Sequence, residues 1–319
     1  MKASQKRAMA LALLFDILFG DPPNRFHPVA WMGSLIGWVD RRATSQRPMS
    51  DLVAGAGLVF GGGALIMLVA RAIERILSRL SPNLVWLLEA AGLKMTFSLH
   101  GLRRTAAEVE MSLEAGNLPQ ARRLVSWHLV SRDTSKLDAC GVAAATIESV
   151  AENASDGVIA PLFYYLVGGL PLAFAYRFIN TADSLLGYHD PKHEWLGKIP
   201  ARLDDLVNWL PARLTAGLFV LAAFLCGENG AGAWQMLKRD PSQTQSPNAG
   251  YPMSAMAGAL GVELEKVGHY RLGAGFPKPV VTDIHRSIRL LSAAAWLGFF
   301  LFQLLPHANW IKRVNRGNQ

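Results

Sequence analysis

Acidic and amide side chains gather in three stretches of this chain, each beside an apolar segment. The first stretch carries Glu148, Glu152 and Asp156, and their four-residue spacing would place three carboxylates on one helix face. No Lys or Arg occurs between residues 137 and 176 to neutralise them. A solvated acidic surface is the ordinary interpretation. We favour function, because carboxylates entering a membrane-length segment are costly and a cation such as Mg²⁺ or a substrate ammonium would relieve their repulsion.

The other two stretches show the same mixture of carboxylates and amides. They consist of Asn180 with Asp183, and of Asp204 and Asp205 with Asn208. Arg202 and Arg213 flank the last group and could clamp a phosphate between guanidinium and metal. Structural ion pairs between Arg and Asp would explain either stretch alone. Three such stretches at the edges of apolar segments favour a shared site.

Weaker candidates lie elsewhere. Arg132 precedes a predicted helix that Asp133 or Thr134 would cap, and a helix N-terminus beside a guanidinium suits phosphate. Asp21 follows an apolar segment that itself contains an aspartate, whereas His27 could simply be a buried imidazole. Residues 246–252 have the composition of a loop.

Several common catalytic signatures are missing from the sequence. There is no Walker A motif, no Gly-x-Gly-x-x-Gly, no His-Glu-x-x-His and no Gly-x-Ser-x-Gly. The two cysteines, Cys140 and Cys226, form neither a disulfide framework nor a zinc motif. A standard nucleotide-binding fold or serine hydrolase is therefore unsupported.

The composition predicts that membrane helices position these residues. Hydrophobic residues make up 51% of the 319 residues, charged residues 18%, and the formal charge is +8. We expect spans at 52–70, 157–176 and 290–311, and a fourth from 207–227. Segments 8–20 and 84–102 could add a fifth.

Details within these segments predict contacts and bends. Gly57 and Gly61 would let another helix approach closely, and Pro161 and Pro171 would kink their span. The N-terminal apolar segment has no cleavage site after it, so we expect it to be retained.

Outside the spans, two regions are predicted to be more polar. Residues 102–130 show helical periodicity on either side of a Gly-Asn-Leu-Pro turn, which predicts a helical hairpin outside the lipid. Residues 228–287 are expected to form a polar loop. The fold class is thus an all-α polytopic membrane bundle of about four to five spans, with 1–319 as a single catalytic domain. No basic stripe with interleaved aromatics is present, so nucleic acid is not an expected partner.

Taken in order, the motifs resemble one family, the adenosylcobinamide-phosphate synthases of cobalamin biosynthesis. The resemblance covers roughly residues 14–272. It rests on Asp16, Gly20-Asp21-Pro22-Pro23, His27-Pro28-Val29, Arg132-Asp133-Thr134, Glu148-Ser149-Val150-Ala151-Glu152-Asn153, Ser155-Asp156-Gly157, Pro161-Leu162-Phe163, Asn180-Thr181, Asp183-Ser184, Gly187-Tyr188, Ala201-Arg202-Leu203-Asp204-Asp205, Asn208, Pro211-Ala212-Arg213 and Ser246-Pro247-Asn248-Ala249-Gly250. The sequence departs from the family pattern at Ser131, Gln245 and residues 264–266, which puts the details of those loops in doubt.

The resemblance implies an ATP-dependent amide ligase of the bacterial cytoplasmic membrane. Such an enzyme joins (R)-1-amino-2-propanol or its O-phosphate to a propionate of adenosylcobyric acid, a corrinoid. Mg²⁺ is the expected metal, and other late cobalamin-pathway membrane enzymes are possible partners.

The site residues expected from the resemblance fall into three groups. Glu148, Glu152 and Asp205 would bind metal. The catalytic group is Glu152, Asp183, Asp204, Asp205 and Asn208, with Asp183 or Asp204 as the base. The substrate- or phosphate-binding group is Asp21, His27, Arg132, Asp133, Asn153, Asn180, Tyr188, Arg202, Arg213, Ser246 and Asn248.

Two other functional classes stay open. A membrane prenyl- or phosphotransferase also places Asp-rich motifs at the membrane edge to hold Mg²⁺-diphosphate, although it usually shows paired Asp-x-x-x-Asp repeats. A transporter could use intramembrane acids to bind a cation.

Overall fold

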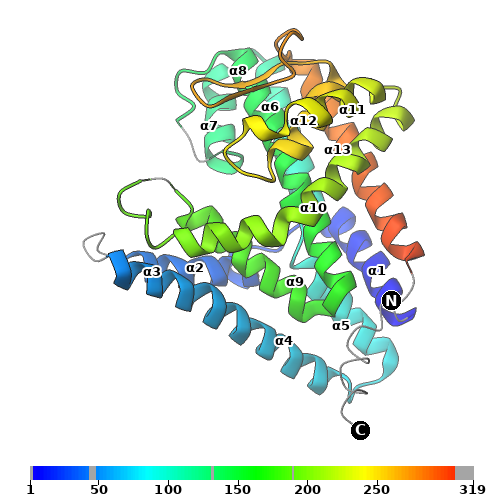
Figure 1. The fold of residues 1–319 in the computed structure, drawn as a ribbon. Coiled ribbons are helices and arrows are strands. Elements are labelled where there is room, and N and C mark those ends of the chain that lie inside the picture. The colour runs from blue at the N-terminus through cyan, green and yellow to red at the C-terminus, as the bar shows by residue number, and fades with distance from the viewer. Residues whose placement is uncertain (1–2, 43–47, 131–132, 189, 306–319) are drawn as a thin grey trace.

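The computed structural model shows an almost entirely α-helical protein (Figure 1) and describes residues 3–42, 48–130, 133–188 and 190–305. The helices are α1 (Ala3–Phe19), α2 (Pro28–Asp40), α3 (Pro48–Ala56), α4 (Gly63–Leu77), α5 (Pro82–Lys94), α6 (Leu99–Glu114), α7 (Leu118–His128), α8 (Ala139–Ala154), α9 (Ala160–Leu186), α10 (Lys198–Leu225), α11 (Gly230–Arg239), α12 (Gly250–Leu260) and α13 (Val281–Leu304). Strands β1 (Leu264–Lys266) and β2 (Tyr270–Leu272) form one antiparallel hairpin. Short 3₁₀ turns occupy Asn24–Phe26 and Pro241–Gln243. The predicted all-α class is confirmed.

Four continuous helical segments are long and apolar enough to cross a membrane: Pro48–Leu77, Ala139–Leu186, Lys198–Leu225 and Val281–Leu304. They overlap the four spans expected from the sequence, although residues 306–311 of the expected span 290–311 lie outside the described residues. Helix α1 has 17 residues, fewer than the 20 or so that a bilayer requires. Segment 84–102 is not one helix, because α5 ends at Lys94 and α6 begins at Leu99.

Lys94 explains why α5 cannot continue as a lipid-facing span. Its ammonium is only 4% exposed and lies 3.0 Å from an oxygen of Asp16, which is itself fully buried. It also bonds to Asp21. A charge in this position is stable only with paired carboxylates, so α5 packs against α1 inside the protein.

The first span contains glycines that meet neighbours, but they are not the predicted pair. Nothing lies within 4 Å of where a side chain would begin at Gly57 or Gly61. At Gly55 that position lies 2.1 Å from the Leu196 carbonyl oxygen, and at Gly62 it lies 2.6 Å from the Phe178 ring. The prediction that Gly57 and Gly61 form the contact was wrong. A π-helical turn (Gly57–Gly62) joins α3 to α4, so straight-helix spacing does not apply there.

The second span is interrupted at two points that matter for the site. A π-helical turn, η3 (Ser155–Ile159), joins α8 to α9 just before Pro161. Farther along, Gly168 and Gly169 leave the helical conformation, with Gly169 at φ +71°, two residues before Pro171. The kink predicted near Pro171 is thus confirmed, whereas near Pro161 the structure shows a π-helical turn. Helix α8 begins later than expected, because its cap is Asp138, which accepts from the Gly141 amide, and not Asp133 or Thr134.

Helices α6 and α7 form the predicted hairpin. Gly116 has φ +69° between them, and Asn117 caps α7 by accepting from the Gln120 amide. The hairpin lies beside α8 at one end of the molecule (Figure 1). Residues 228–287 are not simply a polar loop. They contain α11, the β-hairpin and α12, whose residues are almost all buried.

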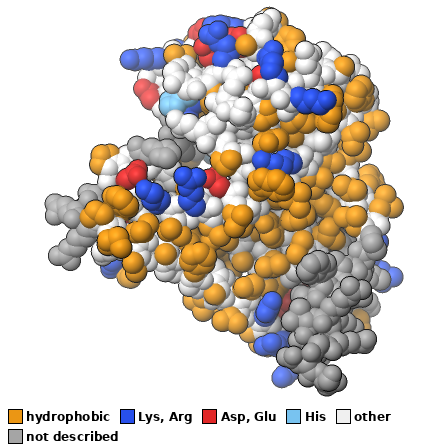
Figure 2. Space-filling view, in the orientation of Figure 1, with side chains coloured by type: hydrophobic (Ala, Val, Ile, Leu, Met, Phe, Trp, Pro, Cys, Tyr) orange, Lys and Arg blue, Asp and Glu red, His pale blue; other side chains and the backbone are white. Residues whose placement is uncertain are grey.

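The two ends of the molecule differ in surface chemistry. In Figure 2, hydrophobic side chains cover much of the lower and right-hand surface, and charged side chains gather at the top and on the left. Exposed large hydrophobic residues follow the outer faces of the spans. They include Phe60, Leu65 and Leu68 on the first, Leu221 and Phe224 on α10, and Phe300 and Leu304 on α13. This arrangement fits a multi-pass membrane protein whose polar end lies outside the lipid.

Candidate active site

The three acidic stretches meet at one cavity of about 550 Å³. It lies among the ends of α8 and α9, the first half of α10, the start of α12 and the β-hairpin. Its charged lining residues are Glu152, Asp156, Asp183, Glu194, Asp204 and Asp205, with Lys198, Arg202 and Lys266. Six carboxylates thus face three side-chain cations. Glu152, Asp183 and Asp205, far apart in sequence, share this cavity as expected.

The cavity reaches two of the three carboxylates in the first acidic stretch. Glu152 precedes η3 and Asp156 lies within it, and both line the cavity. Glu148, one turn earlier on α8, is 4% exposed and lies in the buried part of the bundle, outside the lining. The inserted residue of a π turn rotates the residues after it about the helix axis, and such turns are frequent at functional sites.

Two amides hold the deepest carboxylate, Asp204, in place. The Asn180 side-chain nitrogen lies 3.3 Å from Asp204 Oδ1 and 3.3 Å from Asp156 Oδ2, so one amide bridges two acids. Asn208 donates to Asp204 Oδ2 at 2.9 Å. Tyr176 in turn donates to Asn208 Oδ1 at 2.8 Å, which fixes the direction of that amide.

The acids of the cavity also repel one another. Asp156 and Asp204 lie within electrostatic reach of each other and of Asp183, whereas Lys266 attracts Glu152. Carboxylate and amide oxygens are hard donors that suit Mg²⁺ or a similar cation. Among the described residues, no three His, Cys, Asp or Glu side chains form a ready-made metal cluster. A Mg²⁺ here would need oxygens from water or a substrate phosphate to complete its shell, which is how Mg²⁺ is usually held.

The predicted phosphate-binding arginines have different environments. Arg202 lines the cavity, is 79% exposed and lies 3.9 Å from Asp205. Arg213 is outside the lining. Its guanidinium lies 4.4 Å from the Trp209 ring centre and 4.0 Å from that of Tyr251, and it donates to Asn248 Oδ1 at 3.2 Å.

Asn248 and Ser246 belong to the loop before α12, and both line the cavity. Asn248 donates to the backbone oxygen of Asp205 at 2.7 Å. Ser246 accepts from the backbone amides of Asn248 and Ala249, each at 3.2 Å. Arg213 therefore positions Asn248, and Asn248 positions Asp205.

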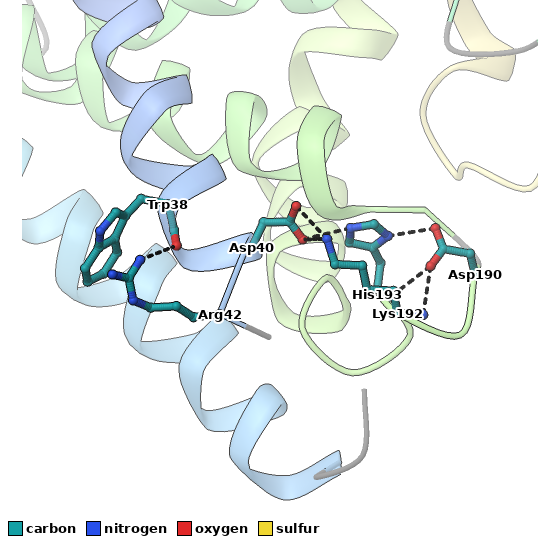
Figure 3. Close-up of polar contacts among 6 residues, drawn as sticks. All are labelled: Trp38, Asp40, Arg42, Asp190, Lys192 and His193. Carbon is teal, nitrogen blue, oxygen red and sulfur yellow. Dashed lines mark hydrogen bonds and ion pairs between the residues drawn. The ribbon is translucent and has the colours of Figure 1, made fainter. Parts of the chain in front are cut away.

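The loop between α9 and α10 forms one rim of the cavity and is fastened to α2 by charged groups (Figure 3). His193 lies between two aspartates, with Nε2 3.0 Å from Asp40 Oδ1 and Nδ1 2.7 Å from Asp190 Oδ2. Lys192 pairs with Asp40 at 2.7 Å. The hydrogen bond from His193 holds the pKa of Asp190 below its ordinary value.

Glycine is required where this loop leaves α9. A side chain at Gly187 would begin 2.2 Å from Asp183 Oδ1, so a larger residue would displace that carboxylate. The adjacent Tyr188 is 40% exposed and lies beside His193, not in the cavity lining.

The remaining predicted site residues lie away from this cavity. Asp133 is exposed and accepts hydrogen bonds from Ser135, and Asn153 donates to Ser149 on its own helix. Asp21 and His27 line a second, smaller cavity. Arg132 lies outside the described residues.

Sequence reasoning did not select several lining residues. Lys266 and His269 come from the β-hairpin, and Glu194 and Lys198 from the rim loop and the start of α10. Tyr176 supports the site from an apolar stretch in which it looked like core. The one sequence signal for the hairpin residues is that Lys266 and His269 stand three residues apart within the polar region 228–287.

Comparison with known proteins places this geometry in context. Residues 9–295 match the family model described as CobD/Cbib protein. The chain is 44% identical to the "Cobalamin biosynthesis protein CobD" of Dehalococcoides mccartyi, with 89% of this chain and 92% of the relative aligned. It is 39% identical to the protein of that name from Klebsiella pneumoniae (92% and 95% aligned). It is 37% identical to the "Cobalamin biosynthesis protein CbiB" of Salmonella choleraesuis (92% and 95% aligned). No solved structure matches the fold.

Proposed function

Because the chain belongs to the CobD/CbiB family, we propose that it is the ATP-dependent ligase that attaches the aminopropanol arm in cobalamin biosynthesis. The reaction would join (R)-1-amino-2-propanol or its O-phosphate to a propionate of adenosylcobyric acid. The membrane would be the bacterial cytoplasmic membrane, where other late-pathway membrane enzymes could be partners. The observation that carries the proposal is the convergence of six carboxylates and three cations on one cavity at the polar end of membrane helices.

Amide formation sets the chemical requirements. A carboxylate is a poor acyl donor. In the proposed reaction, a propionate oxygen attacks the terminal phosphorus of ATP, giving an acyl phosphate and ADP. The amine nitrogen then attacks the acyl carbon, phosphate leaves, and the nitrogen gives up a proton to a base.

The cavity contains groups suited to each requirement. Lys198, Arg202 and Lys266 would bind phosphate oxygens. Glu152 and Asp205 would hold Mg²⁺, which neutralises phosphate charge when it is bound. Asp183 or Asp204 would take the proton. Asp204 is buried and is oriented by the side-chain amides of Asn180 and Asn208. Asp183 is partly buried and lines the same cavity.

Replacing Asp205 with Asn tests the assignment. The variant keeps the size of the side chain and the Asn248 bond to the backbone oxygen, and removes the charge. We expect ATP-dependent conversion of adenosylcobyric acid to fall by about tenfold or more, because charge at the phosphate site is lost. The measurement is mass analysis of the corrinoid product formed by purified protein and by a strain that needs exogenous cobinamide.

The matched control is Glu108→Gln on α6, which removes a partly exposed carboxylate that pairs with Arg104 and lies outside the acid-rich cavity. Normal turnover by Asp205→Asn would show that the reaction does not need the Asp205 carboxylate. Thermal unfolding with ligands separates the enzyme classes. A corrinoid should stabilise the ligase, and stabilisation by an isoprenyl diphosphate instead would favour a prenyltransferase.

A further inference from the structure

A second cavity of about 320 Å³ shares no lining residue with the acid-rich cavity. Its polar lining comes from distant parts of the chain: Asp21 and Asn24 after α1, His27 before α2, Ser98 before α6 and Arg177 on α9. The proposed amide chemistry uses none of these residues. Their charges and hydrogen bonds indicate what the cavity would accept.

Arg177 supplies a positive charge that forms no direct salt bridge in the described residues, although the Asp156 carboxylate lies within its electrostatic reach. One terminal nitrogen donates to the Asp156 backbone oxygen and to Asn180 Oδ1, each at 3.2 Å, and both acceptors are uncharged groups. Its Nε is buried without a hydrogen-bond partner, and no carboxylate in the described parts of the chain forms a salt bridge with it. A guanidinium has five donors in a planar fork, and a desolvated one is stable only with an anion or acceptors around it. An anion in this cavity would satisfy Arg177.

Asp21 supplies the opposite charge at the same cavity. Its carboxylate is 33% exposed and bonds to Lys94 and to the Ser98 hydroxyl. Lys94 must also neutralise Asp16, which is fully buried. One ammonium shared between two carboxylates leaves one negative charge uncompensated, and Asp21 is the member that reaches the cavity.

His27 adds a neutral donor. Its Nδ1 accepts from the Val29 amide at 3.2 Å, so the ring proton is on Nε2. Burial, together with the positive charges of Lys94 and Arg177, lowers the pKa of His27 despite the opposing effect of Asp21. The ring is therefore uncharged near neutral pH and does not alter the balance between Asp21 and Arg177.

Two hydrogen bonds to backbone oxygens connect this cavity to the acid-rich one. The Ser98 amide donates to the Gly157 oxygen at 3.1 Å, and Arg177 donates to the Asp156 oxygen. Both acceptors lie in η3, the turn that carries Asp156 into the acid-rich cavity. The two cavities are therefore built on opposite sides of one structural element.

We propose that the second cavity binds a small zwitterion, with a phosphate monoester at Arg177 and an ammonium group at Asp21. Its lining has one excess charge of each sign, and its volume suits a molecule of a few heavy atoms and not a corrinoid. Naming the ligand as the phosphorylated amine substrate rests on the proposed function. The binding site itself does not.

Direct binding to the full-length protein in detergent tests the site, with O-phosphoethanolamine as the probe. Ethanolamine and inorganic phosphate, each with half of the charges, should bind at least about tenfold more weakly. Arg177→Gln should weaken O-phosphoethanolamine binding by a similar factor. Arg202→Gln, which removes a cation from the acid-rich cavity, should leave it unchanged.

A second variant covers the case in which Arg177→Gln disturbs folding. Ala30→Leu adds bulk to the cavity lining without changing charge, and it should also weaken binding of the probe. The proposal is overturned if neither variant weakens binding, if Arg202→Gln does so instead, or if inorganic phosphate binds as tightly as the zwitterion.

The two proposals can fail separately. If the probe binds through Arg177 but the protein makes no amide, the site stands and the ligase function falls. If amide is made and both Ala30→Leu and Arg177→Lys keep the normal KM for the phosphorylated amine, the ligase function stands and the second site falls.

Discussion

At the scale of single residues, the site depends on amides as much as on acids. Asp204 is 8% exposed, and each of its oxygens accepts from a different asparagine. A buried carboxylate is stable only with such donors, since its desolvation is otherwise uncompensated. The amides therefore help acids that repel one another to remain close together.

Asn208→Leu should show this dependence. The substitution removes one donor to Asp204 and leaves the buried Tyr176 hydroxyl with only its longer bond, at 3.2 Å, to the Asp156 backbone oxygen. We expect a loss of about 2 kcal/mol or more in stability, together with reduced turnover. Thermal unfolding and the corrinoid assay measure the two effects. Thr146→Val is the control, because that buried hydroxyl bonds only to its own helix, and an equal loss in both variants would contradict the argument.

The second cavity should make stability depend on pH through His27. At pH values well above about 6.5 the imidazole is neutral in both the folded and the unfolded chain, so it contributes no pH dependence there. As the pH falls below 6.5, the unfolded chain binds a proton that the folded chain, with its lowered pKa, does not. Stability must then decrease until the folded pKa is reached.

The variant His27→Asn isolates this contribution. Asn keeps an oxygen that can cap α2 and does not titrate. We expect the unfolding midpoint of the natural protein to fall more between pH 7.5 and about pH 5.5 than that of the variant. Identical pH profiles would show that His27 is equally basic in both states.

At the scale of elements, close packing at glycine places the rim of the cavity. Gly55 allows α3 to touch the Leu196 carbonyl oxygen, in the loop whose neighbours Glu194 and Gly197 line the acid-rich cavity. That loop is also fastened to α2 by His193 and Lys192. The first span therefore supports the rim, although none of its residues enters the cavity.

Gly55→Ala should destabilise the protein by about 1–3 kcal/mol, because the added methyl group has no space against backbone. It should also raise the KM for substrates by moving the rim. Gly57→Ala, two residues away with open space around it, should be close to neutral. Thermal unfolding of both variants is the measurement, and equal destabilisation would mean that the span packs through the Gly57–Gly61 face after all.

At the scale of the whole molecule, the polar parts lie at one end. The α6–α7 hairpin and the β-hairpin lie at the top of Figure 1, and α13 runs from that end down the right-hand side to the start of α1. Since Val281–Leu304 is long and apolar enough to span a bilayer, its two ends should face opposite sides of the membrane.

Cysteine labelling tests this arrangement in a background without Cys140 and Cys226. Trp127→Cys on α7 and Val267→Cys in the β-hairpin, both highly exposed positions, should react with an impermeant maleimide from the same side. Leu304→Cys should react only from the other side. Labelling of Val267→Cys and Leu304→Cys in the same vesicle orientation would contradict a membrane-spanning α13.

The residue types and their local spacing were enough to predict much of the fold of this protein. Apolar stretches of membrane length predicted the four spans, because backbone groups in lipid must be satisfied within a helix. The Gly-Asn-Leu-Pro turn predicted the α6–α7 hairpin, because turns require particular residues. The family was evident from the ordered motifs. Of the predicted acids, Glu152, Asp183, Asp204 and Asp205 do share a cavity.

Only the tertiary structure decided which motifs belong together. Helix spacing grouped Glu148 with Glu152, and both lie on α8 before the π turn, but Glu148 is one turn farther from the cavity in the buried part of the bundle. Asp21 and His27 resembled parts of the same site and instead line a separate cavity with Arg177. Lys266 and His269 join the acids through a hairpin that has no strong sequence signal. The spacing of residues along a helix determines which of them share a face of that helix. Which other segment packs against that face depends on contacts between segments more than a hundred residues apart in the sequence.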